Sequence, residues 1–347
     1  MPRKSDSAGE CVLIARLSAI GDVAMTIPAV YSACRSNPGT KFVMLTRAWM
    51  AGMFVDRPEN LEIESPDLGG RHKGPLGMWR LARDIRRKWH ITAFADIHNV
   101  IRTRLLGLFL RASGIRVATI DKGRSEKRRL IRCGAAAAAP LRPQIERYAD
   151  VFRRLGLSMD VPFDGLWRGH ATAPADCPAK TYIVVAPFAA HKGKIYPPDL
   201  MEKVIKGLAD HGLDILIMGG GGEEQRQAED WAARYPGVTS VAGKRLGFTR
   251  ELELINHAAA TLAMDSANMH LSALAGTPTI SVWGATHPAC GFAPWRQQEG
   301  IVQASMPCRP CSVYGNKPCR LARRPVCMDA IPPETIIETV LNLMKNG

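Results

Sequence analysis

The chain has 347 residues, of which 46% are apolar and 22% charged, a composition that excludes a disordered protein and allows two domains with separate cores. No apolar run approaches the roughly 20 residues of a membrane-spanning helix. The first residues lack the apolar stretch of a secretory signal, so we expect a cytoplasmic protein. The net charge of +14 favours a polyanionic partner, which leaves nucleic acid, an anionic membrane surface or a phosphorylated substrate.

Short apolar runs alternate with helical patterns along the first half of the chain. Strands are predicted at 11–15, 41–46, 91–96 and 116–120, and helices at 23–35 and 102–112. This alternation predicts an open parallel sheet with helices on its faces. The basic stretch 122–129 fits either a solvated loop or a loop that binds an anion.

A shift to Pro, Ala, Gly and Asp between residues 156 and 180 predicts a linker. Beyond it the pattern of apolar runs and amphipathic stretches resumes, at 182–186, 198–211, 214–218, 250–259, 260–264 and 279–283. These segments predict a second doubly wound sheet. We therefore place a first domain at 1–165, a second at 178–331 and a C-terminal helix at 332–347.

Strand-to-helix turns offer the backbone N–H groups and the positive helix end that phosphate binding needs. One turn, at 18–22, carries Asp22, which fits either a helix cap or an active carboxylate. Another holds four glycines at 219–222, which suits a nucleotide or a tight connection. The third, at 264–270, places small polar side chains at a helix start.

Two blocks in these turns, 12–28 and 265–278, resemble glycosyltransferase family nine, the ADP-heptose:lipopolysaccharide heptosyltransferases. The segments 194–197, 243–254 and 282–288 extend this resemblance, so that it runs from about residue 12 to residue 331. The family implies an α/β fold of the GT-B type, with two Rossmann-like doubly wound domains facing across a cleft. It also implies that the acceptor binds the amino-terminal domain and the donor the carboxyl-terminal one.

The resemblance implies a metal-independent reaction that inverts the anomeric centre, with Asp22 as the base that takes the proton of the acceptor hydroxyl. Lys194 would hold the leaving diphosphate, and Asp265 the sugar hydroxyls. The residues expected to bind the donor are Lys194, Glu223, Leu246, Asp265, Ser266, Ala267, Asn268 and His270. Those expected to bind the acceptor are Ser18, Ala19, Gly21, Arg102, Arg128 and Arg129.

The family also implies an ADP-heptose donor, a lipid-linked anionic core oligosaccharide as acceptor, and peripheral contact with the inner face of the inner membrane. No cofactor and no nucleic acid partner are expected. The chain departs from the family at Ala189 and Ala190, where hydroxyl residues are common before the lysine, and at Ala267 and Asn268. These departures leave the donor sugar more open than the fold.

Cysteines are concentrated near the carboxyl terminus, at Cys308, Cys311, Cys319 and Cys327. Four thiolates in a short segment suit zinc, but the spacing is not that of two CxxC elements, so we favour reduced or occasionally bridged thiols.

Two other interpretations stay open. One is a transferase of the same fold with a different nucleotide sugar or surface-glycan acceptor. The other, from another class, is a basic nucleic-acid-binding protein, although no helix-turn-helix, zinc-finger or aromatic stacking pattern supports it. An epimerase would need a G-x-G-x-x-G fingerprint after the first strand, and residues 18–22 do not supply one.

Overall fold

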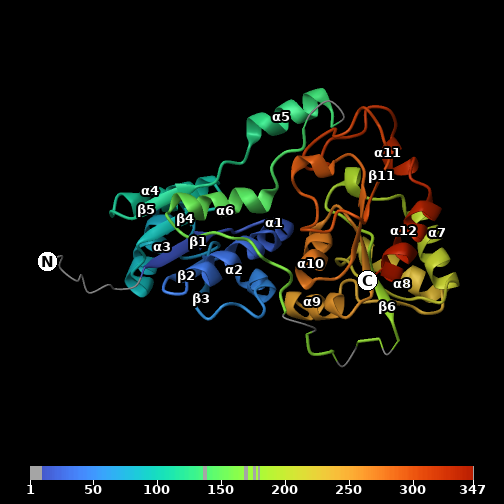
Figure 1. Ribbon diagram of the computed structural model, residues 1–347, viewed down its shortest axis with the longest axis horizontal. Helices are drawn as coiled ribbons and strands as arrows, with labels where there is room; N and C mark the ends of the chain where they lie inside the picture. The colour runs from blue at the N-terminus through green and yellow to red at the C-terminus, as the bar shows by residue number, and fades with distance from the viewer. Residues whose placement is uncertain (1–9, 136–138, 168–170, 175–176, 179, 347) are drawn as a thin grey trace. The chain divides into compact units, whose positions relative to one another are not determined.

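The computed structural model describes residues 10–135, 139–167, 171–174, 177–178 and 180–346 (Figure 1). The chain forms two compact units. Unit 1 comprises Met1–Lys122 and Gln144–Phe163, and unit 2 comprises Gly123–Pro143 and Asp164–Gly347. Each unit contains one parallel sheet covered by helices, which confirms the predicted α/β class.

The sheet of unit 1 has the strand order β3-β2-β1-β4-β5, and every neighbouring pair is parallel. Its central strand β1 is fully buried, with Val12 beside Phe42 on one side and Ala93 on the other. The strands span Cys11–Ala15 (β1), Lys41–Leu45 (β2), Leu61–Glu64 (β3), Ala93–Asp96 (β4) and Arg116–Thr119 (β5). Strands buried on both faces consist almost entirely of apolar residues, which explains why β1 is recognisable in the sequence.

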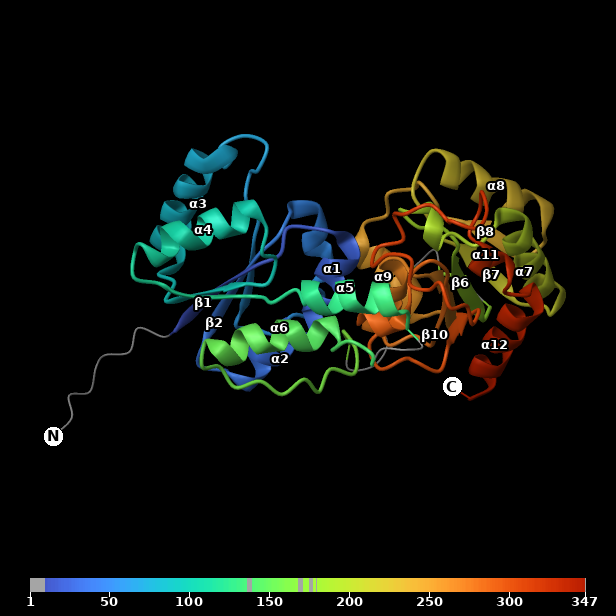
Figure 2. The same ribbon diagram turned by 90° about the horizontal axis from the view of Figure 1, so that it is seen from above.

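Helices cover both faces of this sheet. On one face α3 and α4 lie side by side, and their buried residues Leu81 and Leu106 pack with Leu13 of β1. On the other face α2 packs against α6, as Figure 2 shows. The helices of the unit are α1 (Ile20–Ala24), α2 (Thr26–Ser36), α3 (Gly74–Trp89), α4 (Ile101–Arg111), α6 (Gln144–Arg154) and the 3-10 helix η1 (Ala48–Met53).

The sheet of unit 2 has the order β11-β10-β9-β6-β7-β8 and is also parallel throughout. Its strands span Tyr182–Ala186 (β6), Asp214–Ile217 (β7), Val238–Ser240 (β8), Ala260–Met264 (β9), Thr279–Trp283 (β10) and Ile301–Gln303 (β11). The two edge strands, β8 and β11, have three residues each and were not predicted, because so short a segment carries no periodicity.

The core of unit 2 lies between this sheet and the helices α7, α8 and α12, which contribute Val204, Trp231 and Ile336. The helices α9 and α10 pack against each other, and α10 also contacts β9 and β10. The helices are α5 (Arg124–Cys133), α7 (Pro198–Asp210), α8 (Glu223–Arg234), α9 (Phe248–Asn256), α10 (Ala267–Ala275), α11 (Val326–Asp329), α12 (Pro333–Asn346), η2 (Lys192–Lys194) and η3 (Pro288–Cys290). None of the helices in the described residues is long and apolar enough to cross a membrane.

The segment Gly123–Pro143 differs from the sequence-based boundary, which assigned residues 1–165 to one domain. Leu130 of α5 is buried with Ala289 and Cys290 of unit 2. The backbone also connects there, because Leu141 N donates to Ala289 O at 2.8 Å. The basic stretch considered a loop forms the helix α5, with Leu130 on its buried side.

Candidate functional site

Both sheets contain one point where the strand order reverses. In unit 1 the chain proceeds from β1 to β2 and β3 on one side and then to β4 and β5 on the other. In unit 2 the reversal lies between β6 and β9. Open parallel sheets bind ligands beyond the carboxyl ends of the strands at such points. Asp22 follows β1, Lys194 follows β6 and Asp265 follows β9, so the fold carries the three main predicted residues to these positions.

Asp22 lies inside the short helix α1 and not at its start. Ala19 is the N-cap, and the Asp22 carboxylate accepts a hydrogen bond from Ala19 N through Oδ2 at 3.4 Å. This is the contact that an N3 carboxylate makes in a capping box, so Asp22 supports the helix start from N3 and is not the N-cap itself. The same Oδ2 is 2.5 Å from Arg16 Nη2, and the side chain is 29% exposed. Oδ1 takes part in neither of these two contacts and is the carboxylate oxygen left for a substrate hydroxyl.

Arg16 anchors this carboxylate from a buried position at the end of β1. Its Nε donates to Ser18 O at 2.8 Å and its Nη1 to Ile97 O at 3.0 Å. The guanidinium also lies over the ring of Tyr148, 5.9 Å from the centroid. Because the planar fork is fixed by two carbonyls, it holds Asp22 Oδ2 in one direction. Sequence reasoning missed Arg16, since a charged residue at a strand end gives no sign of burial.

His98 supports the same turn from the end of β4. Its Nδ1 faces Leu17 N at 3.3 Å, and its Nε2 lies 3.4 Å from Ser18 Oγ. A backbone N–H can only donate, so Nδ1 is the acceptor and the proton is on Nε2. Burial, and then the nearby charge of Arg16, lowers the pKa of His98 to about 3. The neutral ring thus donates to Ser18 Oγ and leaves the Ser18 hydroxyl proton for another acceptor.

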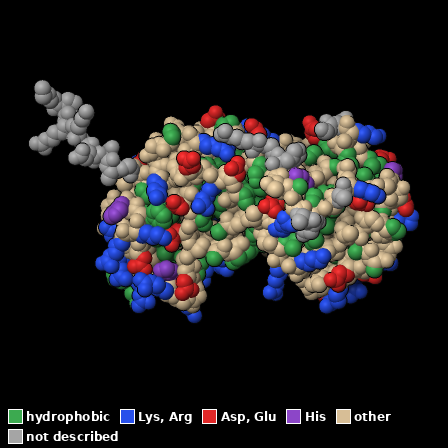
Figure 3. Space-filling view, turned by 90° about the horizontal axis from the view of Figure 1, so that it is seen from below, with side chains coloured by type: hydrophobic (Ala, Val, Ile, Leu, Met, Phe, Trp, Pro, Cys, Tyr) green, Lys and Arg blue, Asp and Glu red, His purple; other side chains and the backbone are tan. Residues whose placement is uncertain are grey.

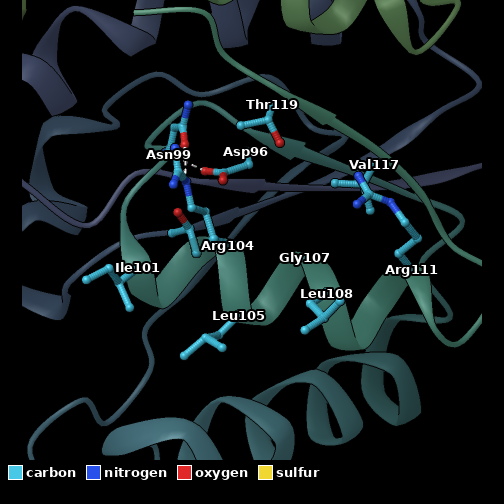
Figure 4. Close-up of a pocket in the computed structure, with 11 residues that line it drawn as sticks. Asp96, Asn99, Ile101, Arg104, Leu105, Gly107, Leu108, Arg111, Val117 and Thr119 are labelled. Atoms are coloured by element: carbon cyan, nitrogen blue, oxygen red, sulfur yellow. Dashed lines mark hydrogen bonds between the residues drawn. The ribbon is translucent and has the colours of Figure 1, made fainter.

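A cavity of about 490 Å³ opens in unit 1 between α4 and the edge strand β5 (Figure 4). Asp96 is buried beneath it, and its Oδ1 accepts from His98 N and Asn99 N at 3.1 and 2.7 Å. Burial raises the pKa of Asp96. Arg104 and Arg111 also line the cavity, whereas Arg102, the predicted acceptor residue on this helix, is exposed and does not.

The switch point of unit 2 holds a second cation–carboxylate pair. Lys194 Nζ lies 2.9 Å from Asp265 Oδ2, and the exposed fractions of these side chains are 17% and 6%. Thr286 Oγ1 donates to the same oxygen at 2.7 Å. Thr286 follows β10 and lies in a segment that carried the family resemblance. Its contact with Asp265 could not be read from the sequence, because the two residues are 21 positions apart. The structure thus brings Lys194 and Asp265 together as predicted for one site.

The helix α10 begins beside this pair. Ser266 is its N-cap, and the helix starts at Ala267, so the first backbone N–H groups belong to the predicted segment. Ser266 Oγ is buried and has no hydrogen-bond partner in the described residues. A buried hydroxyl without a partner at a positive helix end favours an anionic oxygen as its ligand. Asn268 is half-buried, and His270, two residues further along α10, is buried.

The glycine turn after β7 ends at Gly222, whose φ of 72° lies in the left-handed region. Glu223 begins α8 and is exposed, while Glu224 Oε2 accepts from Gly220 N at 2.7 Å and closes the turn. Leu246 is half-buried in the loop before α9. These predicted donor residues follow β7 and β8, on the side of β6 away from Asp265.

Arg309, between two cysteines, is buried and fixes the loop behind Lys194. Its guanidinium donates to the carbonyls of Gly284, Trp283, Thr286 and Ala304 and to Gln303 Oε1. The same loop reaches Gly315, where a Cβ would come within 2.7 Å of Lys194 Cγ. The four cysteines around it are free thiols. Among the described residues, no group of three or more His, Cys, Asp or Glu side chains is arranged to hold a metal ion.

Comparison with known proteins places these features in a family. A model described as glycosyltransferase family 9 (heptosyltransferase) matches residues 78–320. The chain is 22% identical over 311 residues to lipopolysaccharide heptosyltransferase 1 of Pseudomonas aeruginosa, which covers 86% of this chain and 85% of that protein. It is 30% identical over 168 residues to lipopolysaccharide heptosyltransferase 3 of Escherichia coli, with 47% and 46% covered.

Solved structures share the fold. The glycosyl transferase family 9 structure from Veillonella parvula has a TM-score of 0.74 at 14% identity, covering 97% of this chain and 98% of that one. The E. coli heptosyltransferase WaaC with ADP has a TM-score of 0.67 at 17% identity, covering 96% and 99%.

Two Rossmann-like parallel sheets and the likeness to these structures define a fold of the GT-B class. The predicted fold class is thereby confirmed. Because the family model spans most of its length, the chain belongs to glycosyltransferase family 9, the heptosyltransferase family.

Proposed function

We propose that this glycosyltransferase transfers a heptose from ADP-heptose to a lipid-linked, anionic core oligosaccharide of lipopolysaccharide. The reaction inverts the anomeric centre and needs no metal ion. The observation that carries the proposal is the pair formed by Lys194 and Asp265 beside the unpartnered Ser266 hydroxyl. An ammonium, a free hydroxyl and the N-terminus of α10 offer a diphosphate the positive charge and donors that a divalent ion supplies in other transferases.

On the acceptor side, Asp22 serves as the general base. Its Oδ2 is committed to Arg16 and Ala19, so Oδ1 takes the proton while the acceptor oxygen attacks the anomeric carbon. The Ser18 hydroxyl, which receives a hydrogen bond from His98, donates to an acceptor oxygen. Ala19 and Gly21 contribute their small size at the same turn.

On the donor side, Lys194 and the α10 N–H groups at Ala267 and Asn268 bind the diphosphate as it leaves. Asp265 positions the Lys194 ammonium through Oδ2. Its Oδ1, which takes part in neither the Lys194 nor the Thr286 contact, accepts from sugar hydroxyls. We assign the ribose to Glu223, the adenine to the Leu246 loop, and a supporting place on α10 to His270.

The anionic groups of the acceptor are assigned to exposed arginines. Arg102 is the second residue of α4 and is close in sequence to His98. Arg128 and Arg129 lie on α5, which packs with unit 2, so their contribution is proposed from that unit and not from the one that carries Asp22. We further propose a peripheral location at the inner face of the inner membrane, no cofactor, and no nucleic acid partner.

Calorimetric titration with ADP, UDP and GDP in the presence of a chelator tests the donor assignment. We expect selective ADP binding that persists without metal. The Lys194→Ala variant removes a charge-assisted contact of about 1.5–3 kcal/mol and should weaken ADP about 10- to 100-fold. Lys192, an exposed cation on the same 3-10 turn, provides the matched control, and Lys192→Ala should change the affinity less than about threefold.

Preference for UDP or GDP would retain the enzyme class and replace the donor. Equal losses in the two lysine variants would remove Lys194 from the diphosphate site. Loss of ADP binding on chelation would contradict the metal-independent mechanism.

A further inference from the structure

The outer faces of α3 and α4 expose large apolar side chains. Seven such side chains are exposed in the described part of the chain, and four of them lie on these two helices. They are Leu76 and Trp79, with exposed fractions of 59% and 44%, and Ile101 and Leu108, with 78% and 56%. The two helices are neighbours on one face of the sheet, so these side chains belong to one surface of unit 1. We call it the α3–α4 face.

The exposed apolar side chains of α4 follow the helical repeat. Ile101 and Leu108 are exposed two turns apart on one side of the helix, whereas Leu105 between them is half-buried and packs against the core, and Leu106 and Leu110 face the sheet. Figure 4 shows Ile101, Leu105 and Leu108 on α4 among the residues that line the cavity of this unit, so the apolar row of the helix borders that cavity. A helix with apolar residues on both sides needs a second apolar environment beyond its own core.

The segment that carries α3 and α4 is also strongly basic, although Lys88 at the end of α3 pairs with Glu64. Between residues 71 and 111 the chain has ten Lys and Arg residues against two Asp, more than half of its net charge of +14. Both acidic side chains are neutralised or hidden, because Asp84 Oδ2 pairs with Arg71 Nη2 at 2.7 Å and Asp96 is 1% exposed. Lys and Arg side chains gather on the lobe of unit 1 in the space-filling view (Figure 3).

This combination distinguishes a lipid surface from the other polyanions. Nucleic acid would reward the arginines but would leave exposed aliphatic side chains such as Ile101 in water. A membrane interface accommodates both, since aliphatic residues enter the acyl boundary, arginines meet phosphate headgroups, and tryptophan prefers the zone between them. Trp79 already carries the Arg83 guanidinium over its ring, 5.1 Å from the centroid.

The position of the face relates it to the acceptor turn. In a parallel sheet the helix that follows a strand begins at the strand's carboxyl edge, so Leu76 and Ile101, in the first turns of α3 and α4, lie at the edge of the sheet that also carries Asp22. We propose that the α3–α4 face docks on a bilayer of anionic phospholipid. This docking face deepens the peripheral location proposed above. That it places the Asp22 turn at the lipid surface from which an acceptor is taken rests on the proposed function.

Vesicle cosedimentation of the full chain tests the proposal. We expect binding to vesicles of equal parts phosphatidylcholine and phosphatidylglycerol, with little binding to phosphatidylcholine alone and weaker binding at high salt. The double variant Ile101→Ser, Leu108→Ser should bind at least about tenfold more weakly, because both side chains are exposed and their loss spares the core. The matched control replaces Tyr314 and Leu321, the exposed apolar residues of unit 2, by serine and should bind like the parent.

The result that overturns the proposal is equal vesicle binding by the α4 double variant and the parent, or an equal loss in the unit 2 control. Salt-sensitive binding to RNA or DNA without vesicle binding would also overturn it. ADP titration of the same double variant separates this inference from the proposed function. An α4 double variant that binds ADP normally but no longer binds vesicles supports the docking role of the α3–α4 face. A parent protein that binds vesicles but not ADP refutes only the donor assignment.

Discussion

His98 should remain neutral from pH 8 down to pH 5 while the folded protein is intact. Its ring is 6% exposed, and the Leu17 N–H occupies the Nδ1 lone pair that a proton would need. Because burial lowers the pKa to about 3, from the usual 6.5, the unfolded chain binds a proton in this window that the folded chain does not. His98 therefore contributes stability that is present above pH 6.5 and is lost as the pH falls toward 3.

The magnitude follows from 1.36 kcal/mol per pKa unit. Between pH 7 and pH 5 the unfolded histidine gains about 2 kcal/mol by protonation, while the folded one gains almost nothing. Unit 1 should lose that much unfolding free energy over this interval through His98. The His98→Asn variant keeps an acceptor for Leu17 N but has no titratable group, so its stability should depend less on pH by about 2 kcal/mol.

Nitrogen NMR of histidine-labelled protein measures both quantities. The signal missing from His98→Asn identifies His98, and its shifts should report a proton on Nε2 and none on Nδ1, unchanged between pH 5 and 8. Urea unfolding, followed by the folded-state signal of His90 in the same unit, gives the free energies at pH 7 and pH 5. A His98 signal that titrates near pH 6.5, or equal pH dependence in parent and variant, would refute the assignment.

Asp22→Asn should lower kcat by about 10²- to 10⁴-fold with little change in Tm. The control is Asp56→Asn, which should leave kcat unchanged, because Asp56 is exposed and asparagine also tolerates its φ of 44°. Comparable turnover in the two variants would exclude Asp22 as the base. Arg16→Lys keeps the positive charge, but one ammonium group cannot reach the two carbonyls and the carboxylate that the guanidinium contacts. We expect kcat to fall in a kinetic assay, while the Kd for ADP measured by calorimetry stays constant. A parallel loss of ADP affinity would show that the damage is global. Arg309→Lys strips partners from buried carbonyls at about 1–3 kcal/mol each, and should lower both Tm and ADP affinity, whereas the exposed Arg320→Lys should alter neither.

The sequence was sufficient for features that depend on neighbours along the chain. Asp22, Lys194 and Asp265 each follow an apolar run, so their place at the carboxyl edge of a parallel sheet was predictable. The contact partners were not. Arg16 is fixed by the carbonyl of Ile97, 81 residues away, and its burial depends on the pairing of β1 with β4.

The segment around α5 was misplaced for a similar reason. Its six charged residues between 122 and 129 favour a solvated loop in the first domain, and the sequence gives no local sign that Leu130 packs on Ala289. A charge run indicates that a face is solvated, but not which core receives the opposite side of the helix. The division of the chain therefore required the tertiary contacts.

The excursion of residues 123–143 into unit 2 governs how this enzyme can be recombined. The chain passes between the units after Lys122, after Pro143 and after Phe163, so unit 2 is encoded in two separate stretches. A hybrid made by a single crossover near residue 164 would combine α5 from one parent with the Ala289–Cys290 surface from the other, and the packing around Leu130 would be mismatched. Exchange of unit 2 between relatives thus calls for a double graft of 123–143 together with 164–347.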